Sequence, residues 1–183
     1  AKLYQFRRKN KLFQGLSFET IPGYGSNGSI IHYRVTKKSN KVLKKNNLFL
    51  FDSGGQYLDG TTDITRTIAI GNPTDEQIFF FTKVLKGHIA LSKAIFKKKT
   101  KGKKLDKIAR RYLLEKKKDY PHGTGHGVGS FSSVHEGPQS ISKTSETLFE
   151  NGMIVSNEPG FYKHKKYGIR IENLFLIKEK KKK

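Results

Sequence analysis

Four of the 15 acidic residues in this chain of 183 residues lie inside or directly after apolar segments, and their placement constrains the fold most strongly. The segments are 48–51 before Asp52, 61–67 around Asp63, 153–157 before Glu158 and 169–177 around Glu172. Burying a carboxylate costs several kcal/mol unless the group is paired or binds a metal. Folding must therefore bring positive charge to these four acids.

Two sources of positive charge fit the sequence. Arg66 and Arg170 would form two internal ion pairs with acids, a purely structural arrangement. Because Arg170 and Glu172 are two residues apart on an expected strand, they would share a face, and Arg170 would orient an acid beside Glu172. Alternatively, two divalent cations would offset four carboxylates, as in a dinuclear centre. Hard oxygen ligands favour Mn(II), with Co(II) or Zn(II) as substitutes.

Four of the six histidines lie in loops beside the expected strands, and they favour the metal centre. His122 and His126 flank a Gly-Thr-Gly segment, where small residues let the backbone fold close to an ion or substrate. His32 and His135 lie in two other loops. The combination of four loop histidines and four strand-borne acids is unusual for surface residues alone.

The remaining sequence predicts one α+β domain. Thr74 is expected to cap a helix, with Gln77 as its capping-box partner. The apolar stripe of this helix comprises Ile78, Phe81, Leu85, His88 and Leu91. His88 is expected to be a core or boundary residue. A second helix carries the stripe Leu105, Ile108, Ala109, Tyr112 and Leu113. Both helices need a sheet to cover.

Four segments are predicted to be strands. Segment 48–51 reads as a strand buried on both faces. Segment 63–68 alternates, with Asp63, Thr65 and Thr67 on one face. Segments 153–158 and 168–177 are the other two, and 122–140 is a long loop or a pair of irregular strands.

Composition limits the partners. Lysine and arginine number 37 and give a net charge of +22, but only seven are arginine, so we expect nucleic acid to bind only non-specifically. The longest apolar runs, 48–51 and 78–81, are far shorter than the ~18 residues that span a bilayer, so no membrane association is expected. The absence of cysteine is typical of a reducing, cytoplasmic location.

Five spaced motifs together resemble a known family. They are Asp52 and Asp63 eleven residues apart, His-Gly-Thr-Gly-His-Gly-Val-Gly at 122–129, Asn-Glu-Pro-Gly-Phe-Tyr at 157–162 and Gly-Ile-Arg-Ile-Glu-Asn at 168–173. Their order resembles the catalytic domain of the aminopeptidase P family of pita-bread (creatinase/aminopeptidase) metallopeptidases, from about residue 15 to 177. The resemblance implies a mostly antiparallel sheet covered by helices.

The resemblance also implies the metal ligands. These are Asp52, Asp63, His126, Glu158 and Glu172, holding two divalent ions, Mn(II) before Co(II) or Zn(II). Asp63 and Glu172 would bridge both ions, Asp52 would hold one, and His126 with Glu158 the other.

The implied catalytic residues surround those ligands. A hydroxide between the two ions would attack the scissile carbonyl, and Glu158 would accept and shuttle the proton. By the same resemblance, His135 steadies the tetrahedral intermediate, and His32 and His122 line the site. Arg170 would hold Asp52 in place, and an active-site tyrosine would be Tyr162.

The implied function is release of an N-terminal residue from peptides with proline at the second position. Prolidase and methionine aminopeptidase share the ligands and remain alternatives, as does a basic relative that binds nucleic acid or ribosomes. Residues 1–183 would form an incomplete catalytic domain, since nothing corresponds to the family's N-terminal domain and the first residue is Ala1. The full-length protein is expected to form a homo-oligomer.

Overall fold

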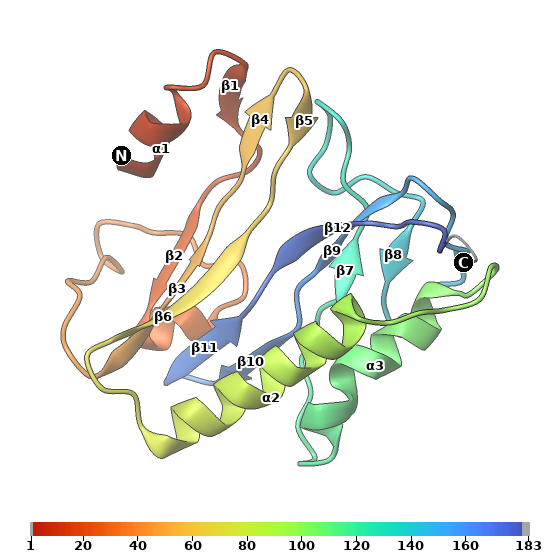
Figure 1. The fold of residues 1–183 in the computed structure, drawn as a ribbon. Coiled ribbons are helices and arrows are strands. Elements are labelled where there is room, and N and C mark those ends of the chain that lie inside the picture. The colour runs from red at the N-terminus through yellow and green to blue at the C-terminus, as the bar shows by residue number, and fades with distance from the viewer. Residues whose placement is uncertain (1, 181–183) are drawn as a thin grey trace.

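The computed structural model describes residues 2–180, which form an α+β fold of helices and antiparallel strands (Figure 1). The helices are α1 (Lys2–Arg7), the short 3-10 helix η1 (Gly25–Ser29), α2 (Asp75–Ser92) and α3 (Gly102–Leu114). The strands are β1 (Phe13–Leu16), β2 (Ile21–Tyr24), β3 (Asn47–Asp52), β4 (Gly55–Tyr57), β5 (Gly60–Thr61), β6 (Thr65–Ile70), β7 (Gly125–His126), β8 (Ser140–Ile141), β9 (Ile154–Asn157), β10 (Gly160–Lys163), β11 (Tyr167–Arg170) and β12 (Asn173–Leu176).

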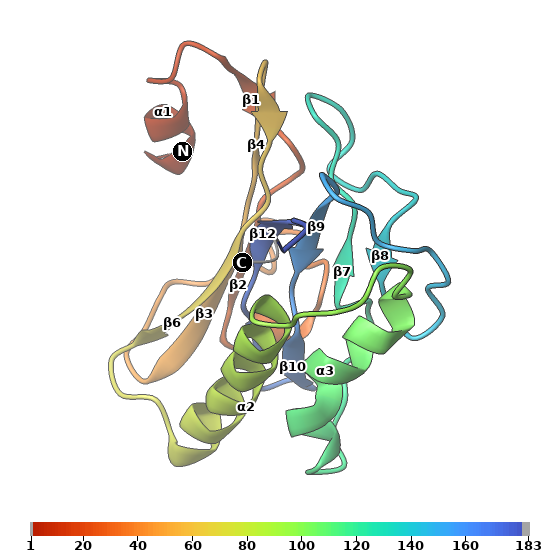
Figure 2. The ribbon, with the colours of Figure 1, turned by 45° about the vertical axis from the view of Figure 1, so that its right-hand side comes forward.

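The strands form two groups that face each other across the molecule. The N-terminal group contains a sheet of order β2-β3-β6 and a smaller sheet of order β1-β4-β5. The C-terminal group contains the antiparallel pairs β10-β11, β9-β12 and β7-β8. Helices α2 and α3 pack side by side and contact the strands of the second group (Figures 1 and 2).

Strand β3 is buried on one face, which corrects the prediction of burial on both faces. Leu48 and Leu50 are buried, whereas Phe49 and Phe51 are only half-buried. The inner face contacts β11, and the two phenylalanine rings on the outer face contact each other, with centroids 5.8 Å apart. The strand therefore alternates as a sheet covered on one face does.

The capping box of α2 is confirmed. The Thr74 hydroxyl accepts a hydrogen bond from the backbone N–H of Gln77, and the Gln77 side chain accepts one from the N–H of Thr74. His88 and Leu91 are buried as predicted, but Ile78 is 50% exposed. The buried face of α2 contains Gln77, Val84, Gly87, His88 and Leu91. Ile78 follows Gln77 directly and is turned about 100° around the helix axis away from it, off this face.

Apolar side chains form two clusters between the helices and the strands. Three residues of the predicted α3 stripe are buried: Leu105, Ala109 and Leu113. One cluster contains Leu48, Val84, Leu113, Tyr120, Phe161, Tyr167, Ile169 and Ile171. The other contains Leu91, Leu105, Ala109, Ile141, Phe149 and Val155. Together they fix the helices against the strands that carry the polar cavity described below.

The predicted strand at 168–177 is two strands, because the chain changes partner in its middle. Strand β11 pairs with β10, and β12 pairs with β9. Between them, the N–H of Glu172 donates to the carbonyl of Thr65 in β6. Strand β10 was not predicted. The segment 122–140, expected to be a long loop or a pair of irregular strands, is mostly loop, with the two-residue strand β7 inside it and β8 beginning at its last residue. The change of partner places Glu172 between both strand groups.

None of the described helices combines the length and apolarity needed to cross a membrane.

Gly87 provides a test of the α2–α3 contact. A Cβ atom at Gly87 would lie 2.2 Å from the backbone carbonyl oxygen of Ala109 in α3. Gly87→Ala should therefore destabilise the fold by roughly 1–3 kcal/mol, although alanine ordinarily stabilises a helix interior. Gly60→Ala is the control, because nothing lies within 4 Å of its added Cβ. Thermal unfolding of both variants gives the comparison, and a Gly87→Ala protein as stable as the parent would contradict the packing described.

Candidate metal centre

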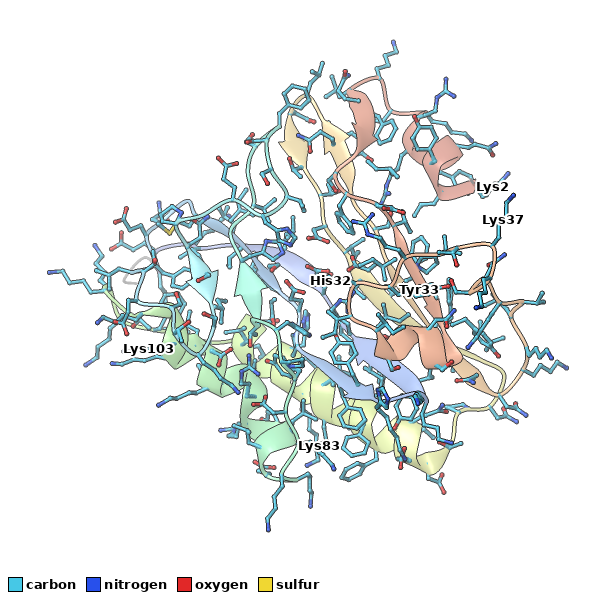
Figure 3. The ribbon with its side chains drawn as sticks, turned by 180° about the vertical axis from the view of Figure 1, so that it is seen from behind. Lys2, His32, Tyr33, Lys37, Lys83 and Lys103 are labelled. Carbon is cyan, nitrogen blue, oxygen red and sulfur yellow. The ribbon has the colours of Figure 1, made fainter. Side chains whose placement is uncertain are left out.

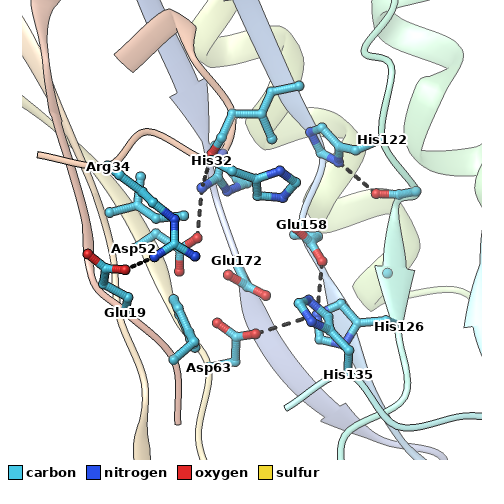
Figure 4. Close-up of a pocket in the computed structure, with 16 residues that line it drawn as sticks. Glu19, His32, Arg34, Asp52, Asp63, His122, His126, His135, Glu158 and Glu172 are labelled. Carbon is cyan, nitrogen blue, oxygen red and sulfur yellow. Dashed lines mark hydrogen bonds and ion pairs between the residues drawn. The ribbon is translucent and has the colours of Figure 1, made fainter. Parts of the chain in front are cut away.

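A cavity of about 320 Å³ lies where the two strand groups meet. Figure 4 shows acids from both groups facing one another across it, with three histidines on the C-terminal side and His32 at one end. Nine of the ten site residues predicted from the sequence line this cavity: His32, Asp52, Asp63, His122, His126, His135, Glu158, Arg170 and Glu172. The tenth, Tyr162, lies behind the wall and contacts His122 and Arg170.

The ends of strands bring the four acids together. Asp52 is the last residue of β3 and lies opposite Thr65, the first residue of β6, in the antiparallel register. Asp63 precedes β6 by two residues. From the other group, Glu158 directly follows β9, and Glu172 lies between β11 and β12. The acids are therefore held by backbone on rigid elements rather than by one flexible loop.

His126 lies beside the acids, on the C-terminal side of the cavity. Its Nε2 atom is 3.4 Å from Oδ2 of Asp63 and 3.2 Å from Oε1 of Glu158. One ligand atom each from Asp63, His126 and Glu172 lies within 4.8 Å of the others. Three donor atoms this close, from one imidazole and two carboxylates, could bind a divalent cation.

Several carboxylate oxygens in this cluster lack partners. Oδ1 of Asp52, Oδ1 of Asp63 and Oε1 of Glu172 are buried and accept no hydrogen bond from any residue in the range 2–180. A buried polar atom without a partner is costly and rare in folded proteins. Each of these acids has its other oxygen within reach of a polar group, so the unpartnered oxygens suit a bound cation.

Ion pairs with arginine account for only one of the four acids. Nη2 of Arg170 donates to Oδ2 of Asp52 at 2.7 Å. Arg66 instead donates to the backbone carbonyl of Glu172 and to the side chain of Asn173. The purely structural alternative of two arginine pairs is therefore wrong.

Electrostatics point to a missing positive charge. Burial, followed by repulsion from neighbouring carboxylates, raises the pKa of Glu172 well above its ordinary value. Burial also raises the pKa of Asp52 to about 6. Burial opposes ionisation of His126, but its contacts with Asp63 and Glu158 outweigh this effect and raise its pKa to about 11. In the metal-free protein, protonated His126 thus supplies part of the charge that a metal ion would supply.

The pKa of Glu158 moves in the opposite direction. Burial would raise it, but the hydrogen bond and charge of His126 lower it below its ordinary value. Ser156 also supports this carboxylate, because its hydroxyl lies 3.0 Å from Oε1 of Glu158 and accepts the backbone N–H of His126. Thr65 supports Glu172 in the same way, with a hydroxyl 2.7 Å from Oε2. Sequence reasoning missed both hydroxyls, which carry no signal beyond their position on strands.

The remaining histidines occupy the walls. The ring of His135 lies edge-on to that of His126, with centroids 4.2 Å apart. Nε2 of His122 lies 2.8 Å from the hydroxyl of Tyr162, which also accepts a hydrogen bond from Arg170. Burial lowers the pKa of both His122 and His135, so these rings tend to be neutral. His88, predicted to be structural, is buried outside the cavity and faces the carbonyl of Asn157.

The outer part of the cavity contains residues that the sequence did not single out. An ion pair joins Glu19 to Arg34, and both side chains are more than half exposed. The apolar part of this wall comprises Phe18, Ile21 and Ile31. The segments 18–21 and 31–34 are far apart along the chain and meet only in the fold, so their composition gives no sign of a shared wall.

A buried acid cluster with one central imidazole, on facing antiparallel strand groups, defines a metal-binding α+β domain. The sequence matches Metallopeptidase family M24 over residues 1–179, and the chain belongs to this family. The predicted resemblance to aminopeptidase P and the predicted pita-bread fold are confirmed.

Two curated relatives illustrate the match. A Laccaria bicolor protein named "Probable Xaa-Pro aminopeptidase P" is 52% identical over 183 residues, covering 98% of this chain and 28% of its own length. An Aspergillus niger protein of the same name is 49% identical over 181 residues, covering 97% of this chain and 30% of its own length. The chain thus spans less than a third of these relatives.

Solved structures agree. The X-prolyl aminopeptidase of Caenorhabditis elegans, described as a cytosolic enzyme with a di-nuclear active site, superposes with a TM-score of 0.92 at 41% identity. The match covers 96% of this chain and 29% of that one. Prolidase from Pyrococcus furiosus superposes with a TM-score of 0.88 at 32% identity, covering 97% of this chain and 51% of that one.

The acid cluster predicts an unusual effect of neutralising Glu172. Its raised pKa means that the stability contributed by the protonated group is present below about pH 4 and is lost as the pH rises through the higher folded value. Gln cannot ionise, so metal-free Glu172→Gln should melt at a higher temperature than the parent at pH 8 and at a similar temperature at pH 4. The same variant should lose most Mn(II) binding. Calorimetry with chelator, followed by Mn(II) titration, measures both effects.

Glu150→Gln is the matched control, because Glu150 is exposed and does not line the cavity. It should change neither the melting temperature nor Mn(II) binding. Glu172→Gln protein that binds Mn(II) like the parent would contradict the role of the cluster as a metal centre.

Proposed function

We propose that this chain carries the catalytic metal centre of an Xaa-Pro aminopeptidase. The single observation behind the proposal is the set of buried, unpartnered carboxylate oxygens around one imidazole, with only one arginine pair among four acids. The names of the closely similar relatives supply the substrate class, an N-terminal residue followed by proline. Because the chain spans less than a third of those relatives, the activity of the whole protein belongs to the proposal.

The ligands we assign are Asp52, Asp63, His126, Glu158 and Glu172. In this assignment the five residues would together hold two divalent ions, with Asp52 on one side of the cavity, His126 and Glu158 on the other, and Asp63 and Glu172 contributing to both. All-oxygen ligands with one imidazole favour Mn(II), and Co(II) or Zn(II) would substitute. When bound, two such ions would activate a hydroxide as nucleophile and polarise the scissile carbonyl.

The chain's own residues would then position and move protons. Glu158, whose Oε1 lies 3.2 Å from Nε2 of His126, would accept a proton from the attacking water. His135, whose ring lies edge-on to that of His126, would donate to the developing oxyanion. Nη2 of Arg170 donates to Oδ2 of Asp52 at 2.7 Å, and Nη1 donates to the hydroxyl of Tyr162 at 2.8 Å. These two bonds fix the side of the cavity that carries Asp52.

We further propose a cytosolic location and assembly into homo-oligomers. The location follows the description of the C. elegans structure as a cytosolic enzyme and the absence of cysteine in this chain. Residues 1–183 would act as the catalytic part of a longer protein, since the relatives are more than three times as long as the matched region.

Paired tripeptides test the substrate class. Proline makes the scissile amide tertiary, so the leaving nitrogen has no N–H, and a site that accepts it must grip the rigid ring by shape. The full-length protein with Mn(II) should therefore cleave Xaa-Pro-Xaa much faster than matched Xaa-Ala-Xaa. Equal rates, or a strict requirement for N-terminal methionine, would move the assignment to another branch of the family.

His135→Ala tests the role of the outer imidazole. If His135 acts mainly on the transition state, its loss should lower kcat more than it raises KM. The expected fall in kcat is about 100-fold, comparable to loss of one oxyanion donor. His164→Ala is the control, because His164 is exposed. A His135→Ala enzyme with an unchanged kcat and a raised KM would assign the residue to binding alone.

Binding of nucleic acid is the second candidate, favoured by the net charge of +22. Figure 3 shows Lys37, Lys83 and Lys103 at three different edges of the molecule, with Lys2 near Lys37, rather than on one basic face. We therefore expect only non-specific binding, which should collapse as salt rises from about 50 to 200 mM. Filter binding with two unrelated RNA sequences measures this, and tight binding to one sequence at the higher salt would favour a binding protein over an enzyme.

A further inference from the structure

A buried arginine on α3 anchors the loop that leads to His126. The side chain of Arg110 is 3% exposed and points toward the segment 119–122. Its guanidinium lies 3.9 Å from the centre of the Tyr120 ring. An arginine buried this deeply requires a full set of acceptors, and the loop provides most of them.

Four hydrogen bonds hold the guanidinium in one orientation. Nε donates to Oδ2 of Asp106 at 2.7 Å, one helical turn earlier on α3. Nη1 donates to Oδ1 of Asp119 and to the carbonyl of Tyr120, both at 2.7 Å. Nη2 donates to the carbonyl of His122 at 2.7 Å. Two of the four bonds thus fix backbone carbonyls: that of Tyr120, two residues before the cavity residue His122, and that of His122 itself.

The network continues from the helix to Glu158. The second oxygen of Asp106 accepts the hydroxyl of Thr124 at 2.6 Å. The carbonyl of Thr124 accepts the backbone N–H of Glu158 at 2.8 Å. Two residues further on, the N–H of His126 donates to Ser156, which also contacts Glu158. The same set of bonds therefore positions both His126 and Glu158.

The sequence of the loop makes such an anchor necessary. The loop contains glycine at 123 and 125, and Gly125 allows close approach to β9, because a Cβ there would lie 1.9 Å from the carbonyl oxygen of Ser156. Glycine also gives the unanchored backbone more freedom than any other residue. Without bonds from outside the loop, His126 would be carried on a flexible segment, and a metal site needs its ligands held rigidly.

We propose that Arg110 is a positioning residue that tunes metal affinity on the His126–Glu158 side of the centre. The inference rests on the ligand assignment given under the proposed function. Arg110 does not touch the cavity, and it acts through the backbone of the His122–His126 loop. Lysine would keep the charge beside Asp106 but could not reproduce the planar fork to two carbonyls.

Co(II) titration of the full-length protein tests the proposal without any activity measurement. Wild-type protein should bind two Co(II) ions with a characteristic visible spectrum. Arg110→Lys should lower the affinity for one of the two Co(II) ions by ten- to a hundredfold, the range typical of residues that orient metal ligands. It should change the affinity for the other ion by less than about threefold. The visible absorption of Co(II) at the weakened site should also change in the Arg110→Lys protein. Arg111→Lys, an exposed neighbour on the same helix, should match wild type.

The outcomes separate the possible failures. Unchanged affinities and spectrum in Arg110→Lys, or equal weakening of both ions together with a lower melting temperature in chelator, would overturn the proposal and leave Arg110 a structural residue. If Arg110→Lys does not fold, Thr124→Val cuts the same network from the loop side, and its failure to weaken one ion selectively would overturn it equally. A wild-type protein that binds no Co(II) would instead overturn the proposed function.

Discussion

Mutual repulsion among three buried carboxylates and the partly buried Glu158 is the interaction on which the rest of this structure depends. Like charges this close cannot all be ionised in a low-dielectric cavity without a compensating cation. The pKa directions record the conflict, since those of Asp52 and Glu172 are raised and that of His126 is raised with them. One arginine offsets one acid, so a divalent metal is the economical source of the remaining charge.

The scaffold resolves the conflict by holding the ligands rigidly while leaving their oxygens free. Strand ends carry the acids, and hydroxyls of Thr65 and Ser156 fix one oxygen of a carboxylate at a time. Stability and function therefore oppose one another here, because any change that satisfies the free oxygens within the protein would also remove a metal ligand. Helix α3 contributes indirectly, through buried polar side chains behind the His122–His126 loop.

Much of the site was predictable because its chemistry is local in sequence. Asp52 and Glu158 each follow an apolar run, and His126 stands in a glycine-rich loop, so burial and chemistry conflict visibly within a few residues. The capping box at Thr74 is local for the same reason. The end of strand β11 at Arg170 was not predictable. It arises because the chain pairs with β10 up to this point and with β9 in the following strand, β12. The Glu19–Arg34 wall likewise exists only through long-range packing.

The most direct test is a crystal structure with Mn(II), with anomalous diffraction recorded at the manganese absorption edge. The account predicts two anomalous peaks in the cavity, one beside Oδ1 of Asp52 and one beside Nε2 of His126, with Asp63 and Glu172 between them. In that structure the buried oxygens that now lack partners would each contact an ion. No peak, or a single peak outside the acid cluster, would contradict the central claim that these carboxylates exist to hold two metal ions.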